Sequence, residues 1–447
     1  MFKFGVAKRD ITPIEMMVIP GYFEKRFVKT ILDPLYAKAM VFETDGTFAV
    51  TVVCDAINLR RDDVLRIRRG ICEKTGISEK YISASATHTH TGGPTWDWYD
   101  ASEHDPRYID MLVEGAVDAA VEAFEKREEA KIGFAKTEVP GYAFIRRFKM
   151  KNGRYLTNPG FGNPDIVEPC GTPDNSFIVG KVCNKDGKIL AFISNFGVHL
   201  DMLGGYLNDL SKVSADYAGY LAKLVSEKYG EEIESVFFTG PCGNTNHNDF
   251  TKSIRPAGDV PVYQKTANAL FAALCDIEEK IELSDDINLK VSREFLSARL
   301  RMPTKEYIET AMRILRGEDV KFMNYGIENY NRKNNRHIAL ATLDAASNPI
   351  KMIDVEVMTL TLGDSAIVTW PAEVFVEYGK AVREKFEDKN IIIAELSNGS
   401  FGCYLPTEDA IEQGGYEPTI TGATTPEPQI GTDMVNATVE LLLKSFE

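Results

Sequence analysis

The chain is poor in cysteine and contains no long hydrophobic run. Its 447 residues include 7 cysteines, an odd number, and no two of them form a Cys-x-x-Cys pair. This pattern excludes a disulfide scaffold and a cysteine-type structural zinc site. The first residues lack the apolar core of a signal peptide, and nowhere do about 18 apolar residues follow one another, as a membrane-spanning helix requires. We therefore expect a cytoplasmic protein without stable membrane association.

Positive charge is also scarce. Lys and Arg number 51 against 66 Asp and Glu, which gives a formal net charge of −15. Nucleic acids and anionic membrane surfaces are bound through positive patches, so neither is expected as the main partner. With 44% hydrophobic residues, a chain of this length can bury a large core. We expect an enzyme-sized protein with a small-molecule substrate, and the sequence leaves a homo-oligomer open.

Apolar runs rich in β-branched residues alternate with amphipathic stretches, which is typical of an α/β fold. Strands are predicted at 48–54 and 81–86, with a helix between them. We expect central mixed β-sheets flanked by helices, in a single domain over residues 1–447.

Two regions in the rest of the chain have distinctive patterns. Residues 352–369 predict a hairpin with a two-residue turn. A long β run begins near residue 286, where we place a subdomain boundary. Residues 140–173 are rich in turn signals and are predicted to form a substrate loop.

Two histidines stand i, i+2 just after a predicted strand, in residues 86–94, ATHTHTGGP. In an extended segment, alternation would send the rings of His88 and His90 to the same face. Neutral imidazole suits zinc, and its second nitrogen can be oriented by a neighbouring group. From this pattern alone, a metal site and a simple polar strand cap are equally open.

His199 ends another apolar strand, and the carboxyl ends of strands are where α/β active sites gather. A lone histidine in such a place is more often a satisfied core residue. Glu373 follows a predicted strand, where burial is costly without a cation or hydrogen-bond partner, although stabilisation of a helix N-terminus would also explain it. His104 and His337 lie in polar surroundings, and we assign them no role.

These motifs resemble the N-terminal catalytic domain of the neutral/alkaline non-lysosomal ceramidases, over nearly the whole chain. Residues 86–92 resemble the Ala-Thr-His-Thr-His-Ser-Gly pattern, which is the most specific signature of that family. The other matching segments are 5–13 (GVAKRDITP), 195–199 (NFGVH), 214–220 (SADYAGY), 371–373 (PAE), 404–408 (YLPTE) and 415–417 (GYE).

Carried over residue by residue, the resemblance implies a ceramidase-like catalytic domain that holds one zinc ion. The implied ligands are His88, His199, Glu373 and Tyr404. The resemblance also implies that His90 approaches the reacting centre and that Arg146 or Arg147 positions the substrate.

The sequence departs from the family in one catalytic segment. Residues 243–248, GNTNHN, stand where ceramidases carry Gly-Asp-Val-Ser-Pro-Asn, so Asn246 occupies the position of the catalytic serine and Thr245 precedes it. The family also has a signal peptide and a C-terminal immunoglobulin-like domain, and we expect neither in this chain. These departures leave the lipid substrate of the family open.

The first hypothesis is a zinc-dependent hydrolase in which metal-activated water attacks a carbonyl or amide carbon. His90 would assist proton transfer, and Thr245 or Asn246 would hydrogen-bond the oxyanion. Asparagines around residues 244–249 favour a small polar substrate, derived from a sugar or inositol, and hence a role in carbohydrate metabolism.

Trp96 and Trp98 could form a stacking wall for such a substrate, although they are equally well explained as anchors of their loop. Two alternatives remain for the protein as a whole. One is a ceramidase-type amidase of N-acyl lipids, and the other is a non-catalytic relative that binds a metal or another ligand.

Overall fold

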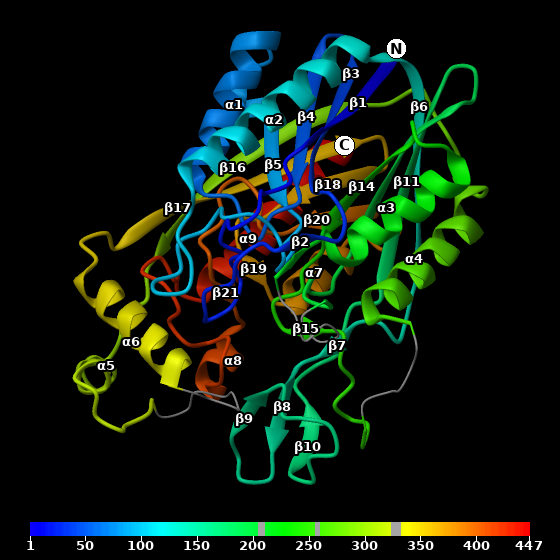
Figure 1. Cartoon of the computed structure of the whole chain (residues 1–447). Helices are drawn as coiled ribbons and strands as arrows, with labels where there is room; N and C mark the ends of the chain where they lie inside the picture. Colours follow the sequence, from blue (N-terminus) through cyan, green and yellow to red (C-terminus); the bar gives the residue numbers. More distant parts are fainter. Residues whose placement is uncertain (204–210, 255–259, 323–331) are drawn as a thin grey trace.

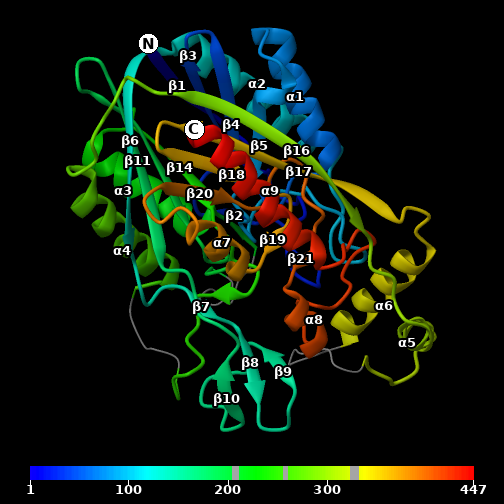
Figure 2. The ribbon, with the colours of Figure 1, turned by 180° about the vertical axis from the view of Figure 1, so that it is seen from behind.

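Two β-sheets lie face to face, and helices cover the outer face of each (Figures 1 and 2). This arrangement is seen in a computed structural model, which describes residues 1–203, 211–254, 260–322 and 332–447. It confirms the predicted α/β class with mixed sheets flanked by helices.

The larger sheet has eight strands within the described residues and mixes parallel with antiparallel pairs. In spatial order they are β14 (Glu234–Thr239), β12 (Ile189–Phe196), β11 (Ser176–Asn184), β6 (Glu128–Glu138), β1 (Phe2–Asp10), β3 (Tyr36–Thr44), β4 (Thr47–Cys54) and β5 (Ile82–Ala86). The smaller sheet has the order β16 (Leu289–Arg299), β17 (Met352–Leu362), β18 (Ser365–Thr369) and β20 (Asn390–Ala394).

One hydrophobic core joins the two sheets. Phe4 and Phe42 from the larger sheet share a cluster of buried side chains with Leu360 and Ile392 from the smaller one. The strands that follow residue 286 therefore form a sheet of their own but bury one face against the N-terminal part of the chain. Removing that apolar surface from water stabilises the pairing of the sheets.

The helices cover both outer faces. Those on the larger sheet are α1 (Arg61–Thr75), α2 (Pro106–Lys126), α3 (Asp216–Tyr229) and α4 (Val262–Glu278). Helices α7 (Val376–Arg383) and α9 (Gln429–Phe446) pack against the smaller sheet, as Figure 2 shows for α9. The other helical elements are η1 (Glu79–Tyr81), α5 (Lys305–Leu315), α6 (Arg332–Ser347) and α8 (Glu408–Gln413).

Helix α2 illustrates how local sequence fixes an element. The side chain of Asp105 accepts a hydrogen bond from the backbone N–H of Arg107, and Pro106 occupies the first turn. Both features favour a helix start, because the first N–H groups have no partner inside the helix. Leu112 and Ala116, spaced four apart, then lie on the buried face.

The region predicted to be a substrate loop, 140–173, contains short strands instead, and this part of the prediction is wrong. β8 (Arg147–Met150) pairs with β9 (Tyr155–Thr157) and β10 (Ile166–Pro169) in a small sheet at the bottom of Figure 1. The strands are short and separated by turns, so neither helical nor strand periodicity extends far enough to be recognised. The remaining strands pair two by two: β7 (Phe144–Ile145) with β15 (Thr245–Asn246), β2 (Thr30–Ile31) with β13 (Lys212–Val213), and β19 (Glu373–Val374) with β21 (Tyr404–Leu405).

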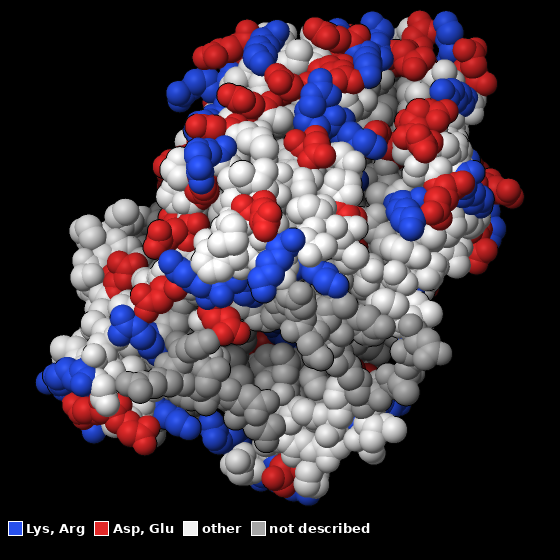
Figure 3. Space-filling model, viewed as in Figure 1, with Lys and Arg blue, Asp and Glu red and all other residues white. Residues whose placement is uncertain are grey.

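The distribution of charge on the surface and the apolar content of the helices are consistent with the net charge and the hydropathy of the sequence. Over the upper part of the face in Figure 3, Lys and Arg side chains are interspersed with Asp and Glu side chains. Within the described ranges, no helix combines the length and the apolar character needed to cross a membrane.

The assignment of His337 to polar surroundings is wrong. Helix α6 places this side chain, which is 4% exposed, among the rings of Phe23, Trp98 and Tyr99, with centroid distances of 4.9, 5.2 and 5.0 Å. Burial lowers the pKa of His337 to about 3.

His337 is therefore expected to make the fold sensitive to acid. Its pKa in the folded chain lies below the unfolded value of about 6.5, so the unfolded state binds the proton more tightly, and stability falls as the pH drops below that value. Between pH 7.5 and pH 5 this one group should cost about 2 kcal/mol of unfolding free energy. Urea unfolding of wild type and His337→Phe at the two pH values measures the difference, and an identical pH dependence in the variant would contradict this account.

Candidate active site

The residues singled out by the sequence meet at the carboxyl ends of the central strands. His88 follows β5, His199 follows β12, and Glu373 follows β18. The pairs β4 and β5, β12 and β14, and β18 and β20 are parallel, so their carboxyl ends point the same way. Residues separated by more than a hundred positions in the sequence therefore come together at one edge of the two sheets.

The two neighbouring histidines converge, but not by strand alternation. β5 ends at Ala86, and His88 has a left-handed backbone with φ of 67°. The prediction that both rings share a face of an extended segment is wrong in its geometry, because the chain turns at His88. Such a conformation is unfavourable for a non-glycine residue and is found where tertiary contacts enforce it, often at functional sites.

Four side-chain atoms face one another at the centre of this cluster. Nε2 of His88 lies 3.3 Å from Nε2 of His90 and 3.2 Å from Oε2 of Glu373. Nε2 of His199 lies 3.4 Å from the same carboxylate oxygen. All four residues are buried, with exposures of 3 to 8%.

Each histidine ring is oriented through its other nitrogen. Nδ1 of His88 lies 2.8 Å from the carbonyl oxygen of Ile57, and Nδ1 of His199 lies 2.9 Å from that of Cys242. Nδ1 of His90 lies 3.0 Å from the carbonyl oxygen of Gly21. A carbonyl can only accept, so each Nδ1 carries the proton and each neutral ring turns the lone pair of Nε2 toward the centre.

Burial and charge set the electrostatics of the cluster. Burial lowers the pKa of His90 well below its usual range, with the charges of His88 and His199 acting in the same direction, and it lowers that of His199 to about 4, together with Arg146. At His88, burial acts the same way, but the negative charge of Glu373 outweighs it and raises the pKa. Burial would raise the pKa of Glu373, but the histidines hold it well below its usual range.

The arrangement fits a bound metal ion. Three imidazoles offer ligand nitrogens that lie within 4.8 Å of one another. Oε2 of Glu373 is buried, and among the described residues no N–H or O–H donor reaches it in hydrogen-bond geometry. Lone pairs and a negative charge grouped in a buried site need a cation between them. Imidazole and carboxylate ligands together are typical of zinc.

Tyr404 lies against this cluster. In β21 it pairs directly with Glu373 of β19, and its ring stacks on that of His199 at 6.2 Å. Burial raises the pKa of the Tyr404 hydroxyl well above its usual range, although the nearby guanidinium of Arg146 acts in the opposite direction. A cation at the cluster would favour the ionised form of this phenol.

The structure separates the roles of the two adjacent arginines. Nη1 of Arg146 lies 3.4 Å from Nε2 of His199, and its Nε and Nη2 donate to Glu417 and to the carbonyl oxygen of Gly243 at 2.8 Å each. Arg147 also donates to Glu417, at 3.2 Å, but its Nη2 points to the carbonyl oxygen of Gly414. Of the two, Arg146 faces the histidines.

Thr245 and Asn246 are tied to neighbouring loops. The hydroxyl of Thr245 lies 3.1 Å from the carbonyl oxygen of Gly197, and since it has a single proton, that proton is used there. Nδ2 of Asn246 donates to Oδ1 of Asn158 at 2.6 Å. The amide of Asn244 donates to Glu377 at 2.8 Å. Two of the asparagines that suggested a polar substrate, Asn244 and Asn246, thus make hydrogen bonds within the protein.

A narrow cavity leads to the histidines. Its walls include Trp96, Trp98, Pro20 and Ile57, together with His88, His90 and Glu373. The free volume of about 20 Å³ is room for about one water molecule. Trp98 lines this cavity and also packs on Phe23 at 5.4 Å, so it serves as a wall and as a loop anchor.

Sequence reasoning missed a polar group beside His90. Nη2 of Arg26 donates to the carbonyl oxygen of His90 at 2.8 Å, and its guanidinium lies 4.3 Å from the ring centroid of Tyr22. The Tyr22 hydroxyl donates to Asp201, whose pKa burial raises to about 6. The only sequence signal for this group was that Asp201 lies two positions after His199.

Glu395 is a second missed residue, and it lies beneath the cluster. Its Oε2 accepts hydrogen bonds from the backbone N–H groups of Val374, at 3.0 Å, and Cys242, at 3.2 Å. Val374 is next to Glu373, and the carbonyl of Cys242 orients His199. Glu395 is fully buried, which raises its pKa to about 8.

Replacing Glu395 with alanine is expected to weaken metal binding. Both N–H groups would lose their acceptor, and the two side chains that they position would loosen. Loss of such supporting contacts costs about 10 to 100-fold in metal affinity. Glu395→Gln keeps an acceptor oxygen and should restore most of this loss. Titration with zinc under competition by a chelator measures the affinity, and an alanine variant with wild-type affinity would rule out the positioning role.

Comparisons with known proteins agree with the fold. The family model for the N-terminal part of neutral/alkaline non-lysosomal ceramidases matches residues 2–280. The crystal structure of neutral ceramidase from Pseudomonas aeruginosa is similar, with a TM-score of 0.72 and 16% identity, over 100% of this chain and 74% of that one. A ceramidase complexed with C2 gives the same TM-score and identity, over 100% and 75%. No curated protein sequence matches the chain significantly.

Proposed function

The chain belongs to the neutral/alkaline non-lysosomal ceramidase family and is a hydrolase, and from this premise we propose that it is a metal-dependent amidase of N-acyl compounds. The observation that carries the proposal is the convergence of three Nε2 lone pairs and the carboxylate of Glu373 on one buried point. We propose one zinc ion there, held by His88, His199, Glu373 and Tyr404.

A bound ion would supply Lewis acidity, polarising a carbonyl oxygen and making water a nucleophile near neutral pH. The chain itself supplies the proton acceptor. Because Nδ1 of His90 is bound to the carbonyl of Gly21, its Nε2 is free to take a proton from water and to return it to the leaving nitrogen. Two contacts help to hold His90 in this orientation. Arg26 donates a hydrogen bond to the backbone carbonyl of His90, and the ring of Tyr22 packs against the imidazole.

Arg146 is placed to stabilise negative charge on the carbonyl oxygen. Its guanidinium is buried next to His199 and fixed by Glu417, so it needs no reorganisation as charge develops. Thr245 and Asn246, proposed from the sequence for this role, are less well placed, because both are bonded to neighbouring loops.

The cavity walls support an N-acyl substrate with an apolar part. Trp96, Trp98, Pro20 and Ile57 offer apolar surface at the approach to the histidines. An apolar wall gains free energy by covering hydrocarbon and gains little from a polyhydroxylated ring. Both solved proteins compared above are ceramidases, which also favours an amide between an acyl chain and an amine.

Parallel assays of the zinc-loaded protein on two amides test this proposal. A short-chain fluorescent ceramide supplies an apolar acyl amide, and N-acetylglucosamine supplies an amide on a polar ring. We expect release of the fatty acid with kcat/KM at least tenfold higher than release of acetate. Faster turnover of N-acetylglucosamine would instead favour the small polar substrate and a role in carbohydrate metabolism.

A further inference from the structure

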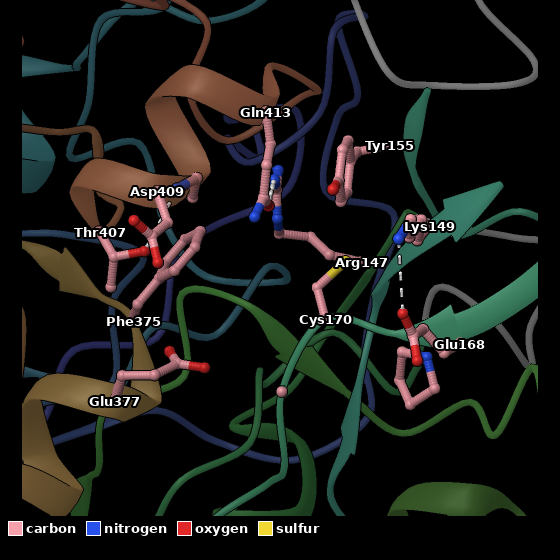
Figure 4. A pocket seen from close by; sticks show the side chains of 13 residues that line it. Arg147, Lys149, Tyr155, Glu168, Cys170, Phe375, Glu377, Thr407, Asp409 and Gln413 are labelled. Atoms are coloured by element: carbon pink, nitrogen blue, oxygen red, sulfur yellow. Dashed lines mark hydrogen bonds and ion pairs between the residues drawn. The ribbon is translucent and has the colours of Figure 1, made fainter. Parts of the chain in front are cut away.

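A second pocket lies apart from the histidines, between the small sheet and helix α8. Figure 4 shows it from close by, with side chains from β8, α7 and α8 around it. Its volume of about 360 Å³ is in the range of small-molecule sites, which begins at roughly 300 Å³. None of the roles proposed above uses this pocket, although Arg147 lines it.

Charges of opposite sign line opposite sides of this second pocket. Figure 4 shows Lys149 and Arg147 on one side, with Glu168 next to Lys149, and Glu377 and Asp409 on the other. Phe375, which also lines it, contributes an apolar surface. A pocket with a cationic and an anionic wall favours a ligand that carries both charges, because a ligand with one charge would leave the other wall unpaired.

The charged side chains on the two walls can form further hydrogen bonds or ion pairs with a ligand. Oε2 of Glu377 accepts from the Asn244 amide, and among the described residues no Lys, Arg or His forms an ion pair with it. Nζ of Lys149 forms an ion pair with Glu168 at 3.8 Å, longer than a hydrogen bond, so the anionic group of a ligand would compete with Glu168 for this exposed cation. Arg147 is already bound to Glu417 and Gly414, so Lys149 is the available cation.

The backbone at Gly171 lies close to the carboxylate of Glu377. Gly171 has φ of +115°, and a Cβ at this position would come within 2.6 Å of Oε1 of Glu377. Only glycine allows the chain to pass here without strain. Burial also raises the pKa of Glu377, and a cationic group next to it would favour its ionised form.

We propose that the second pocket binds a small zwitterion, with its ammonium group at Glu377 and Asp409 and its anionic group at Lys149. The ligand class is an amino acid or ω-amino acid, and this site is independent of the proposed amidase activity. The contact at Glu377 is partly desolvated, so it contributes to affinity more than it would on an open surface, whereas Lys149 and Asp409 are exposed and each contributes less.

Calorimetric titration of the full chain with β-alanine and 6-aminohexanoate, which differ in the separation of their charges, tests the proposal. Hexanoate and hexylamine are the single-charge controls. We expect at least one zwitterion to bind with Kd below about 1 mM, tenfold or more tighter than either control, since one ionic contact is worth about a factor of ten. Absence of binding by both zwitterions at 10 mM, or equal binding of a single-charge control, would overturn the proposal.

Variants locate the binding. Lys149→Gln and Asp409→Asn change exposed side chains and should leave the fold intact, and each is expected to weaken zwitterion binding. Glu377→Gln keeps an acceptor for Asn244 but loses the charge, and it should weaken binding at least tenfold. His88→Ala is the matched control, because it alters the histidine cluster and should bind the zwitterion as wild type does. Loss of binding in His88→Ala, with wild-type binding in Lys149→Gln and Glu377→Gln, would place the ligand in the histidine site and contradict the proposal.

Discussion

His88→Ala is expected to lose most of its bound metal and nearly all of its activity. Binding of structural zinc by four ligands is worth about 10 to 16 kcal/mol, so one ligand accounts for about 3 kcal/mol, or roughly a hundredfold in affinity. The transition-state stabilisation that depends on the ion should fall with it, by about 10³-fold in kcat/KM. Metal content by mass spectrometry and rates with added zinc measure both effects. Chelation of the wild type should abolish activity, and zinc should restore it.

His90→Ala is the informative companion. The ligand set implied by the family resemblance contains His199, Glu373 and Tyr404 beside His88, so His90→Ala should keep its metal while losing rate. The structure places Nε2 of His90 in the same group of three nitrogens. If His90→Ala loses its metal as readily as His88→Ala, the ligands are the three histidines, and His90 does not serve as the proton acceptor. A metal-free wild type with full activity would contradict the metal-dependent mechanism altogether.

Arg146→Met is expected to lower kcat by about 10² to 10³-fold, the cost of removing one donor to a developing oxyanion. The metal content should stay at the wild-type level, because Arg146 is not among the proposed ligands. The variant should also be less stable, since Glu417 is buried and loses one of its two arginine partners. Steady-state kinetics, metal analysis and urea unfolding separate these three effects.

Arg147→Met is the matched control. Arg147 donates to the same Glu417 carboxylate but faces the second pocket. This variant should lose stability to a similar extent while keeping kcat within a few-fold of wild type. Arg146→Lys preserves the charge but not the planar set of donors, and it should recover only part of the rate. Equal losses of kcat at both positions would mean that Arg146 acts only by supporting the fold.

Much of the fold could be predicted from local patterns. The hairpin at 352–369 has the predicted boundaries in β17 and β18, because runs of strand-forming residues and a two-residue turn are both local signals. Helix α6 was missed, since its N-terminal half is polar and its buried face contacts distant aromatic rings. The short strands at 144–169 were missed because a sheet of three- and four-residue strands depends on pairing between segments rather than on periodicity.

The sequence by itself determined the family and the chemical groups: the histidines and the carboxylate at strand ends, and the motifs around them. Only the tertiary structure decided how they face one another. The carbonyls that orient His88, His90 and His199 come from residues 31, 69 and 43 positions away. The choice of Arg146 over Arg147 depends on which guanidinium the packed strands turn toward the cluster. Such contacts follow from the packing of two sheets against each other, which no local pattern records.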